Sequence, residues 1–308
     1  MRTSIIMCMW ACGHGLNMLR RTGTLNAKRY SEVAVMAVTV DETSEPLSFV
    51  TLENVKGDTA KVYLFGACVT SYIKGGRESL MVRPDAKMDG SKPISGGIPF
   101  CFPQFGPGAI QQHGFARNCM WSIDETMDGD APCLVFKLVD DDYTRGMWDF
   151  PFECLYKVTL GVDALSTEFK VSNTGDTSFD FTAALHTYWS ISSISNVRIE
   201  GSFEGASFLD KMQDPPAKSV ASSPVIEISK ETDSVYEGVS GDVILQDSAK
   251  GALTIRSGGW KDTVVWNPYG NEGMGYDSFV CIESAKALKP ISLGPSEEWT
   301  GTMDVIPA

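Results

Sequence analysis

Two histidines and one glutamate in apolar surroundings are the residues of this sequence best suited to acid–base chemistry. The 308-residue chain has three histidines, and His14 lies in a basic segment near the start, which leaves His113 and His186. His186 lies in the strand-like run 183–189, where a hydrogen-bonded core histidine is the usual explanation. Glu283 follows four apolar residues, a position that carboxylates rarely occupy without a partner or a function. A strand end at the edge of the core is the alternative interpretation of Glu283.

His113 follows a run of glycine, proline and aromatic residues over 96–107, with the sequence Gly-Gly-Ile-Pro-Phe-Cys-Phe-Pro-Gln-Phe-Gly-Pro. These glycines and prolines oppose a regular strand or helix. We therefore predict a rigid loop lined by aromatic side chains, in which Gln104 and Phe105 lie. Loops of this kind often carry binding residues on a stiff scaffold.

The elements that must position these residues are short β-rich runs separated by Gly, Pro, Asn and Asp. These runs are 47–55, 61–73, 133–139, 154–162, 167–171, 179–189, 197–203, 252–256 and 278–284. No long helical period is present, so the sequence predicts an all-β sandwich or barrel. We expect one domain over residues 41–308, with a long loop at 211–223, since a fold of this class can extend over 250 residues.

Charge and composition exclude several classes of function. The chain has 26 basic and 39 acidic residues, and five of the basic ones lie within residues 1–31, which contain no acid. Such an acidic body repels nucleic acid and anionic membranes, so we expect neither as a partner. No apolar run reaches the roughly 18 residues that span a bilayer. The eight cysteines form no C-x-x-C pair, and we interpret those after residue 40 as buried free thiols.

The N-terminal segment, residues 1–40, differs from the rest and is treated as an extension. The basic, acid-free composition of residues 1–31 is typical of an organelle transit peptide; an unstructured extension or a misassigned start codon is the alternative. We therefore expect a cytoplasmic protein, or one in a plastid or mitochondrion if residues 1–31 are a transit peptide.

Six segments occur together in the order seen in one enzyme family. They are the runs 96–107, 112–117, 185–188, 209–211, 266–268 and 281–284. On these segments the chain resembles the hexose-6-phosphate mutarotases, also called glucose-6-phosphate 1-epimerases, of the aldose 1-epimerase superfamily. The resemblance runs from about residue 47 to the end and implies a large galactose-mutarotase-like β-sandwich, the supersandwich, as a single domain.

The resemblance also implies a mechanism and a set of site residues. Glu283 matches the family's base, which removes the proton from the anomeric hydroxyl, and His186 matches the acid, which protonates the ring oxygen. His113 would bind the sugar beside the ring, Asp210 would accept a hydrogen bond from a sugar hydroxyl, and Gln104 would shape the pocket. The reaction is redox-neutral, so no cofactor is expected. We assign no metal, since the run Asp-Asp-Asp at 140–142 lacks metal-ligand spacing.

Phosphate recognition is the point at which this sequence departs from the family. Arg117 matches one of the family's arginines, but the position immediately before the Gly-Gly-Ile-Pro run, commonly arginine, is Ser95. The nearby cations Arg77, Arg83 and Lys92 are candidate substitutes. Three functions follow: an epimerase of hexose 6-phosphates, an aldose 1-epimerase of free sugars, which the loss of the arginine favours, and a non-catalytic carbohydrate-binding module. We expect a monomer with a small sugar or sugar phosphate as its partner.

Overall fold

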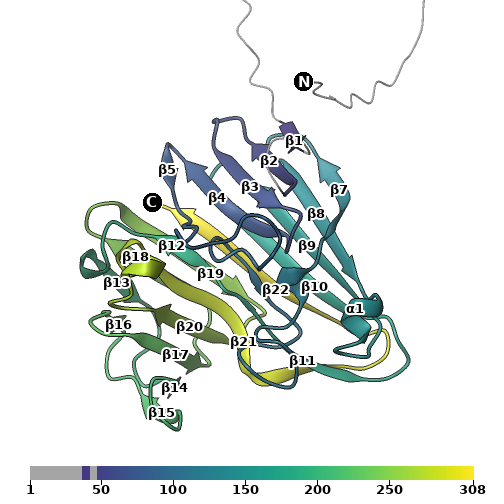
Figure 1. The fold of residues 1–308 in the computed structure, drawn as a ribbon. Coiled ribbons are helices and arrows are strands. Elements are labelled where there is room, and N and C mark those ends of the chain that lie inside the picture. The colour runs from purple at the N-terminus through teal and green to yellow at the C-terminus, as the bar shows by residue number, and fades with distance from the viewer. Residues whose placement is uncertain (1–36, 42–46) are drawn as a thin grey trace, which may run out of the picture. The chain divides into compact units, whose positions relative to one another are not determined.

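The computed structural model describes residues 37–41 and 47–308, all of which belong to one compact unit (Figure 1). The basic segment with His14, for which the sequence analysis considered a transit peptide, lies outside the described residues. The domain boundary predicted between residues 40 and 41 falls inside the first described strand, β1 (Ala37–Asp41), which pairs with β2 (Phe49–Glu53).

The described residues form three antiparallel sheets, which confirm the predicted all-β sandwich. The N-terminal sheet contains, in spatial order, β1, β2, β3 (Thr59–Tyr63), β4 (Cys68–Lys74) and β5 (Arg77–Glu78). The back sheet contains β16 (Val225–Ile226), β13 (Val197–Glu200), β18 (Asp242–Asp247), β19 (Gly251–Gly258), β22 (Glu298–Pro307), β10 (Leu165–Asn173), β9 (Phe152–Leu160), β8 (Cys133–Val139) and β7 (Ser122–Met127). The front sheet contains β15 (Ala217–Val220), β14 (Ser207–Asp210), β17 (Thr232–Glu237), β20 (Asp262–Asn267), β21 (Phe279–Leu293), β11 (Phe179–Leu185) and β6 (Phe100–Cys101), with β12 (Tyr188–Ser190) also paired to β21.

Helices are short in the described part of the chain. They are α1 (Asp142–Arg145) and the 3-10 turns η1 (Ala116–Asn118), η2 (Ile194–Asn196), η3 (Glu272–Met274) and η4 (Tyr276–Ser278). Asp141, in the acidic run that the sequence analysis denied a metal role, caps α1 by accepting a 2.9 Å hydrogen bond from the Thr144 amide. The acidic run thus ends a strand and begins a helical turn.

The back sheet alternates between buried and partly exposed residues, as a sheet with one solvated face should. In β9 every second residue from Phe152 to Leu160 is buried. The buried face packs against Phe100 of β6. Phe100 lies 4.6 Å from Tyr156 and 4.7 Å from Phe169 between ring centroids. The main core is therefore the layer between the front and back sheets.

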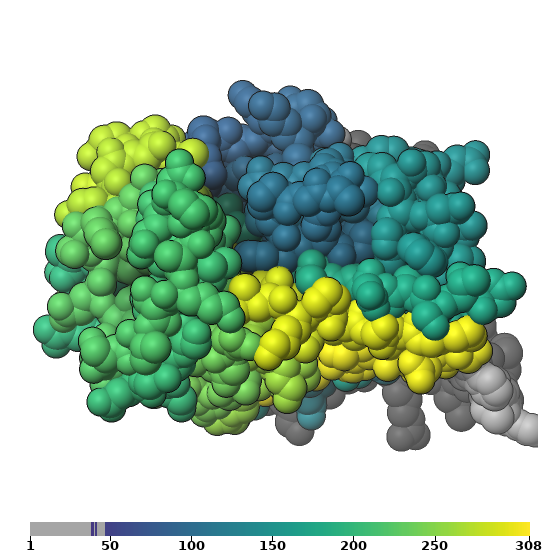
Figure 2. Space-filling model, turned by 90° about the horizontal axis from the view of Figure 1, so that it is seen from below, coloured from purple at the N-terminus to yellow at the C-terminus, as the bar shows by residue number. Residues whose placement is uncertain are grey.

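The front sheet is covered on both faces over part of its width. The first seven residues of β21, from Phe279 to Ala285, are all buried. One face belongs to the main core, and the other carries a smaller cluster that includes Cys101, Ala184 and Val264. Figure 2 views the molecule from below, where the blue segment lies beside the green residues after 200.

Several predicted runs contain breaks that the apolar composition concealed. The run 61–73 is two strands joined by a turn with positive φ at Gly66 and Ala67. The run 179–189 is interrupted at His186 and Thr187, between β11 and β12. The loop predicted at 211–223 contains strand β15, and the glycine- and proline-rich run contains the two-residue strand β6, so both of those predictions were wrong in part.

Candidate active site

His186 and Glu283 lie side by side at the centre of the front sheet. Glu283 is on β21, and His186 follows the end of β11, where its backbone amide donates to Pro99 O at 2.9 Å. The Nδ1 atom of His186 lies 3.3 Å from Oε1 of Glu283. That contact lacks hydrogen-bond geometry, and within the described chain neither His186 Nδ1 nor Glu283 Oε2 has a hydrogen-bond partner. Two buried, unsatisfied acid–base groups in contact are typical of a functional site.

Burial dominates the protonation of this pair. It raises the pKa of Glu283 well above its ordinary value, and the nearby Asp233 adds to the rise, while Lys211 and Arg117 oppose it. Burial likewise lowers the pKa of His186 well below its ordinary value. The neutral forms of both groups are therefore favoured, because burial away from water disfavours either charge.

Aromatic rings fix the orientation of the His186 imidazole. Tyr188 stacks on it with ring centroids 5.0 Å apart and an interplanar angle of 12°, and Trp266 meets it edge-on at 5.7 Å. His186 and Tyr188 share a side, as the alternation of the sequence predicted, even though the strand is broken between them.

His113 lies next to His186, with ring centroids 5.4 Å apart. Its Nδ1 accepts a 3.1 Å hydrogen bond from the Gly106 amide and lies 3.0 Å from the Cys101 sulfur. Burial lowers the pKa of His113 to about 3, with Arg117 as a further cause. The imidazole is neutral at physiological pH, and because Nδ1 accepts, the remaining proton must be on Nε2.

The loop around Gln104 holds His113 in place. Gln104 donates from Nε2 to Gly106 O and Ile110 O at 3.1 and 3.2 Å, and its Oε1 accepts from the Ile110 amide. These bonds occupy the side-chain amide of Gln104, the residue expected to shape the pocket, so Gln104 shapes the loop from within. His113 itself has φ +65°.

Two cations act on all three acid–base groups. Arg117, from η1, and Lys211, after β14, both lower the pKa of His113 and His186 and oppose the rise at Glu283. Arg117 Nη2 donates to Gln112 O at 2.9 Å, and its buried Nε has no partner in the described chain. Lys211 Nζ lies 2.6 Å from Asp233 Oδ2. Sequence reasoning named Arg117 and missed the roles of Lys211 and Asp233.

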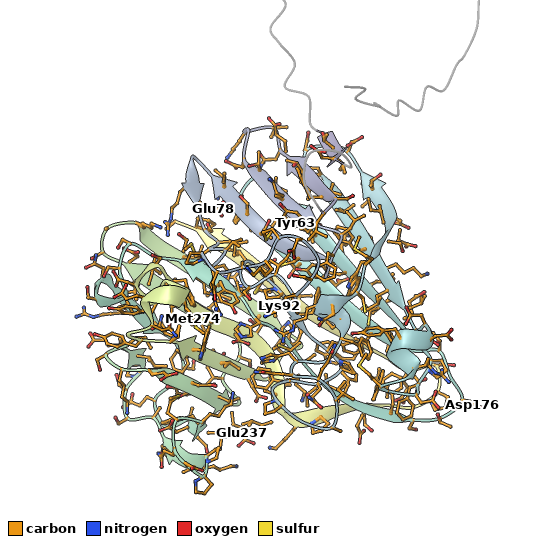
Figure 3. All side chains as sticks on the ribbon, viewed as in Figure 1. Tyr63, Glu78, Lys92, Asp176, Glu237 and Met274 are labelled. Atoms are coloured by element: carbon orange, nitrogen blue, oxygen red, sulfur yellow. The ribbon has the colours of Figure 1, made fainter. Side chains whose placement is uncertain are left out.

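The three candidate substitutes for the missing arginine have different positions. Arg83 donates its backbone amide to Ser95 O at 2.9 Å, so it lies directly opposite the position in question. Its guanidinium hydrogen bonds with the Tyr188 hydroxyl and with Asp85. Arg77 instead donates to Ala252 O of the back sheet, and Lys92 is exposed (Figure 3).

Asp210 is separated from this group by the sheet register. Leu209, Val235, Val264 and Glu283 lie opposite one another across four strands and therefore share a face. Asp210 is one residue later than Leu209 and belongs to the opposite face. Its carboxylate accepts hydrogen bonds from the Met212 amide and the Gln213 side chain.

The six cysteines in the described chain are free and buried, as predicted. Two of them adjoin the acid–base groups. Cys101 contacts His113, and the sulfur of Cys281 lies within 4.8 Å of ligand atoms of His186 and Glu283. Alternation along β21 puts Cys281 on the same face as Glu283, a signal that was available in the sequence.

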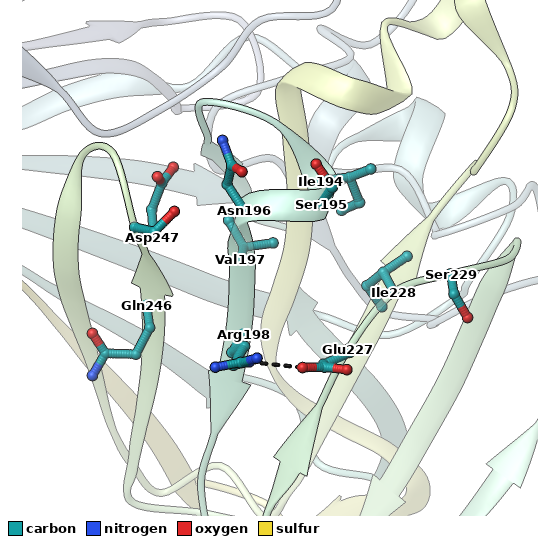
Figure 4. Close-up of a pocket in the computed structure, with 11 residues that line it drawn as sticks. Ile194, Ser195, Asn196, Val197, Arg198, Glu227, Ile228, Ser229, Gln246 and Asp247 are labelled. Atoms are coloured by element: carbon teal, nitrogen blue, oxygen red, sulfur yellow. Dashed lines mark hydrogen bonds and ion pairs between the residues drawn. The ribbon is translucent and has the colours of Figure 1, made fainter.

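A separate groove of about 400 Å³ lies on the back sheet, lined by residues of η2, β13 and β18 (Figure 4). Arg198 and Glu227 pair across it at 2.7 Å, and both side chains are about two-thirds exposed, at 66% and 64%. None of the predicted site residues lines this groove.

Comparison with known proteins agrees with this geometry. Residues 48–305 match the family model described as aldose 1-epimerase. A protein from Cenchrus ciliaris named "Putative glucose-6-phosphate 1-epimerase" is 33% identical over 286 residues, which cover 84% of each chain. A protein of the same name from Escherichia coli is 29% identical over 74% of this chain and 80% of its own. A solved structure of a "putative mutarotase" from Salmonella typhimurium has a TM-score of 0.77 and 26% identity, and covers 90% of this chain and 96% of that one.

The fold is that of the β-sandwich sugar epimerases. With the family model matched over most of its length, the chain belongs to the aldose 1-epimerase family. It is therefore an isomerase with the galactose-mutarotase-like fold, as its resemblance implied. No helix in the described residues is long and apolar enough to cross a membrane.

Proposed function

We propose that this enzyme interconverts the α and β anomers of a hexose 6-phosphate, as a glucose-6-phosphate 1-epimerase does. The observation that carries the proposal is the set of three cations around the acid–base groups, Arg83, Arg117 and Lys211. The body of the chain is acidic, so a local group of cations needs a reason. Guanidinium and ammonium groups are the usual ligands of phosphate. The printed names of the two relatives support the same substrate class.

The proposed chemistry uses Glu283 and His186 as a pair. For ring opening, a proton first passes from Glu283 to His186. The Glu283 carboxylate then takes the proton of the anomeric O1 hydroxyl, and the His186 imidazolium gives its proton to the ring oxygen. The C1–O5 bond breaks and C1 becomes an aldehyde. Both groups are then neutral, the form that burial favours, and rotation about C1–C2 before the reverse transfers yields the other anomer.

His113 contributes a fixed donor. Since its Nδ1 accepts from Gly106, its proton is on Nε2, which lies 3.4 Å from the Gln112 side-chain amide, and this Nε2–H donates to a sugar oxygen in place of that contact. Its lowered pKa keeps the ring neutral, so His113 binds the sugar and takes no part as a base.

Arg83 replaces the arginine that is absent at Ser95. The two residues are joined by a backbone hydrogen bond, and the Arg83 side chain is only 11% exposed, against the Tyr188 hydroxyl. Arg83, a cation on the segment next to Ser95, can therefore bind the phosphate that an arginine at position 95 would bind. Asp85 pairs with Arg83 and would compete with phosphate for its guanidinium.

Free aldoses are the second candidate substrate, favoured by Ser95 itself, because a serine offers no charge. Both substrates use the same acid–base pair and differ in whether the cations are needed.

The deciding experiment follows the anomerisation of α-glucose 6-phosphate, α-glucose and α-galactose by the full chain. Acceleration of the phosphate ester alone supports the proposal. Acceleration of free sugars alone assigns the enzyme to aldoses, and activity on neither would contradict both assignments.

A matched set of variants tests the cations. We expect Arg117→Met, and the pair exchange Lys211→Met with Asp233→Asn, to raise KM for the phosphate ester at least about tenfold. The pair is exchanged together so that no carboxylate is left unpaired beside Glu283. Lys218→Met, a solvated lysine on the adjacent β15, is the control and should change nothing. An equal rise in KM for a free sugar would show that these cations do not recognise the phosphate group.

A further inference from the structure

Three potential metal-ligand atoms converge at the acid–base pair. His186 offers an imidazole nitrogen, Cys281 a sulfur and Glu283 a carboxylate oxygen, all within 4.8 Å of one another. Cys281 and Glu283 are two residues apart on β21, so both project from the same face, and His186 reaches them from the end of β11. The epimerase reaction uses only two of these residues.

A second observation points to a ligand at the same place. Glu283 is buried to 1% side-chain exposure, yet its Oε2 has no hydrogen-bond partner among the described residues, and neither does the Nδ1 of His186. The His186 side chain keeps 12% exposure, so small solutes reach the group from the sugar side. Unpartnered buried polar atoms beside a thiol offer a set of lone pairs to a ligand.

The chemistry and spacing suit zinc. Zinc accepts nitrogen, sulfur and oxygen ligands at about 2.0 to 2.3 Å, which places tetrahedral ligand atoms roughly 3.3 to 3.8 Å apart. The 3.3 Å separation of His186 Nδ1 and Glu283 Oε1 already equals the distance between two ligand atoms of a tetrahedral zinc site. The sulfur of Cys281 needs to approach by about 1 Å, which a side-chain rotation supplies.

We propose that His186, Cys281 and Glu283 form a three-ligand zinc site that blocks catalysis. Binding releases the thiol proton, and any proton on the carboxyl, to solvent, and leaves a fourth position for water. The metal occupies the lone pairs that carry the catalytic protons, so zinc and sugar exclude each other. Zinc binding does not depend on which substrate the enzyme uses, whereas inhibition by zinc rests on the proposed function.

Cobalt(II) absorption tests the site without reference to turnover. Titration of the reduced full chain, with Cys8 and Cys12 changed to serine so that neither contributes, should give a thiolate-to-cobalt charge-transfer band and the visible bands of a tetrahedral site. Cys281→Ser should abolish the charge-transfer band. Cys101→Ser is the matched control, because that thiol is equally buried but touches His113, and it should keep the band.

Zinc should displace the cobalt and inhibit anomerisation competitively with sugar, at least about tenfold more strongly in the parent than in Cys281→Ser. Absence of the band from the parent, or its persistence in Cys281→Ser, would overturn the site. An enzyme with no activity on any sugar but with the band intact would refute the proposed function and leave the zinc site standing.

Discussion

The front and back sheets of this protein bury their residues in different patterns. In β9 of the back sheet, burial alternates strictly along nine residues, so one face meets the core and the other meets water. In β21 of the front sheet, seven consecutive residues are buried. The difference arises because side chains of the 80–115 segment, among them Met81 and Phe105, pack on the second face of the front sheet.

This difference determines where acid–base chemistry can occur. On the back sheet, polar side chains such as Arg198 and Glu227 face solvent and pair there with little effect on each other. On the covered face of the front sheet, Glu283 and His186 lose their hydration, and burial becomes the largest cause of their pKa shifts. A second cover over a sheet thus converts an ordinary carboxyl and imidazole into reactive groups.

The sharpest test of this contrast exchanges one carboxyl on each sheet for an amide. Glu283→Gln should lower turnover by about 10²- to 10⁴-fold, because the amide keeps the shape and loses the base. Glu227→Gln on the back sheet should leave turnover unchanged. Polarimetry gives the rates, and circular dichroism checks that both variants fold. Normal turnover in Glu283→Gln would refute the mechanism.

A glycine exchange tests how tightly the loop cover fits. Gly114 has φ +71°, and a Cβ there would lie 2.1 Å from Phe102 O, so Gly114→Ala should cost at least about 3 kcal/mol of unfolding free energy. Gly57 has φ +76° with no atom within 4 Å, so Gly57→Ala should cost only about 1 to 2 kcal/mol. Denaturant unfolding measures the change in unfolding free energy of both variants. Equal losses of stability would mean that the loop around Gly114 shifts to accommodate the added methyl group.

The pH dependence of the unfolding free energy should report the burial of His113 in the loop that covers the front sheet. His113 has a pKa of about 3 in the folded protein and about 6.5 when unfolded, so below pH 6.5 the unfolded chain binds a proton that the folded one does not. The contribution of His113 to the free energy of unfolding is therefore complete above pH 6.5. It is lost at about 1.4 kcal/mol per pH unit as the pH falls to about 3. The slope of the unfolding free energy against pH should be shallower in His113→Gln than in the parent. Identical slopes in the two proteins would mean that His113 is exposed to solvent.

The smallest effect is expected on the solvated groove of Figure 4. Arg198→Gln removes an exposed ion pair and should change the unfolding free energy by less than about 0.5 kcal/mol, with no change in activity. Thermal unfolding and the anomerisation assay check both. A clear loss of activity would show that the back sheet takes part in function.

The fold could be predicted because the back sheet alternates. The run Cys133–Val139 coincides with β8, and most other predicted runs overlap strands. The breaks at Gly66–Ala67 and at His186–Thr187 could not be predicted, since the sequence remains apolar where both faces are buried and periodicity then carries no signal.

The three acid–base residues that the structure brings together could be selected from the sequence, because His113, His186 and Glu283 are types that seldom lie unpartnered in apolar runs. Their neighbours depend on register. Asp210 and Lys211 are adjacent in sequence, yet a shift of one residue reverses the face, and only the pairing of β14 with β17 shows which one faces Glu283. Without that pairing, Asp210 was preferred to Lys211.

The position of β22 has a consequence for how the chain is made. In the described back sheet, this last strand lies between β10 and β19 and is the link between its two halves. Until residues 298–307 leave the ribosome, β10 and β19 are open edges with unpaired amides and carbonyls, the kind of edge at which chains aggregate. Completion of the sheet must therefore wait until β22 has been synthesised, and a chain that lacks β22 keeps two exposed edges in place of one continuous sheet.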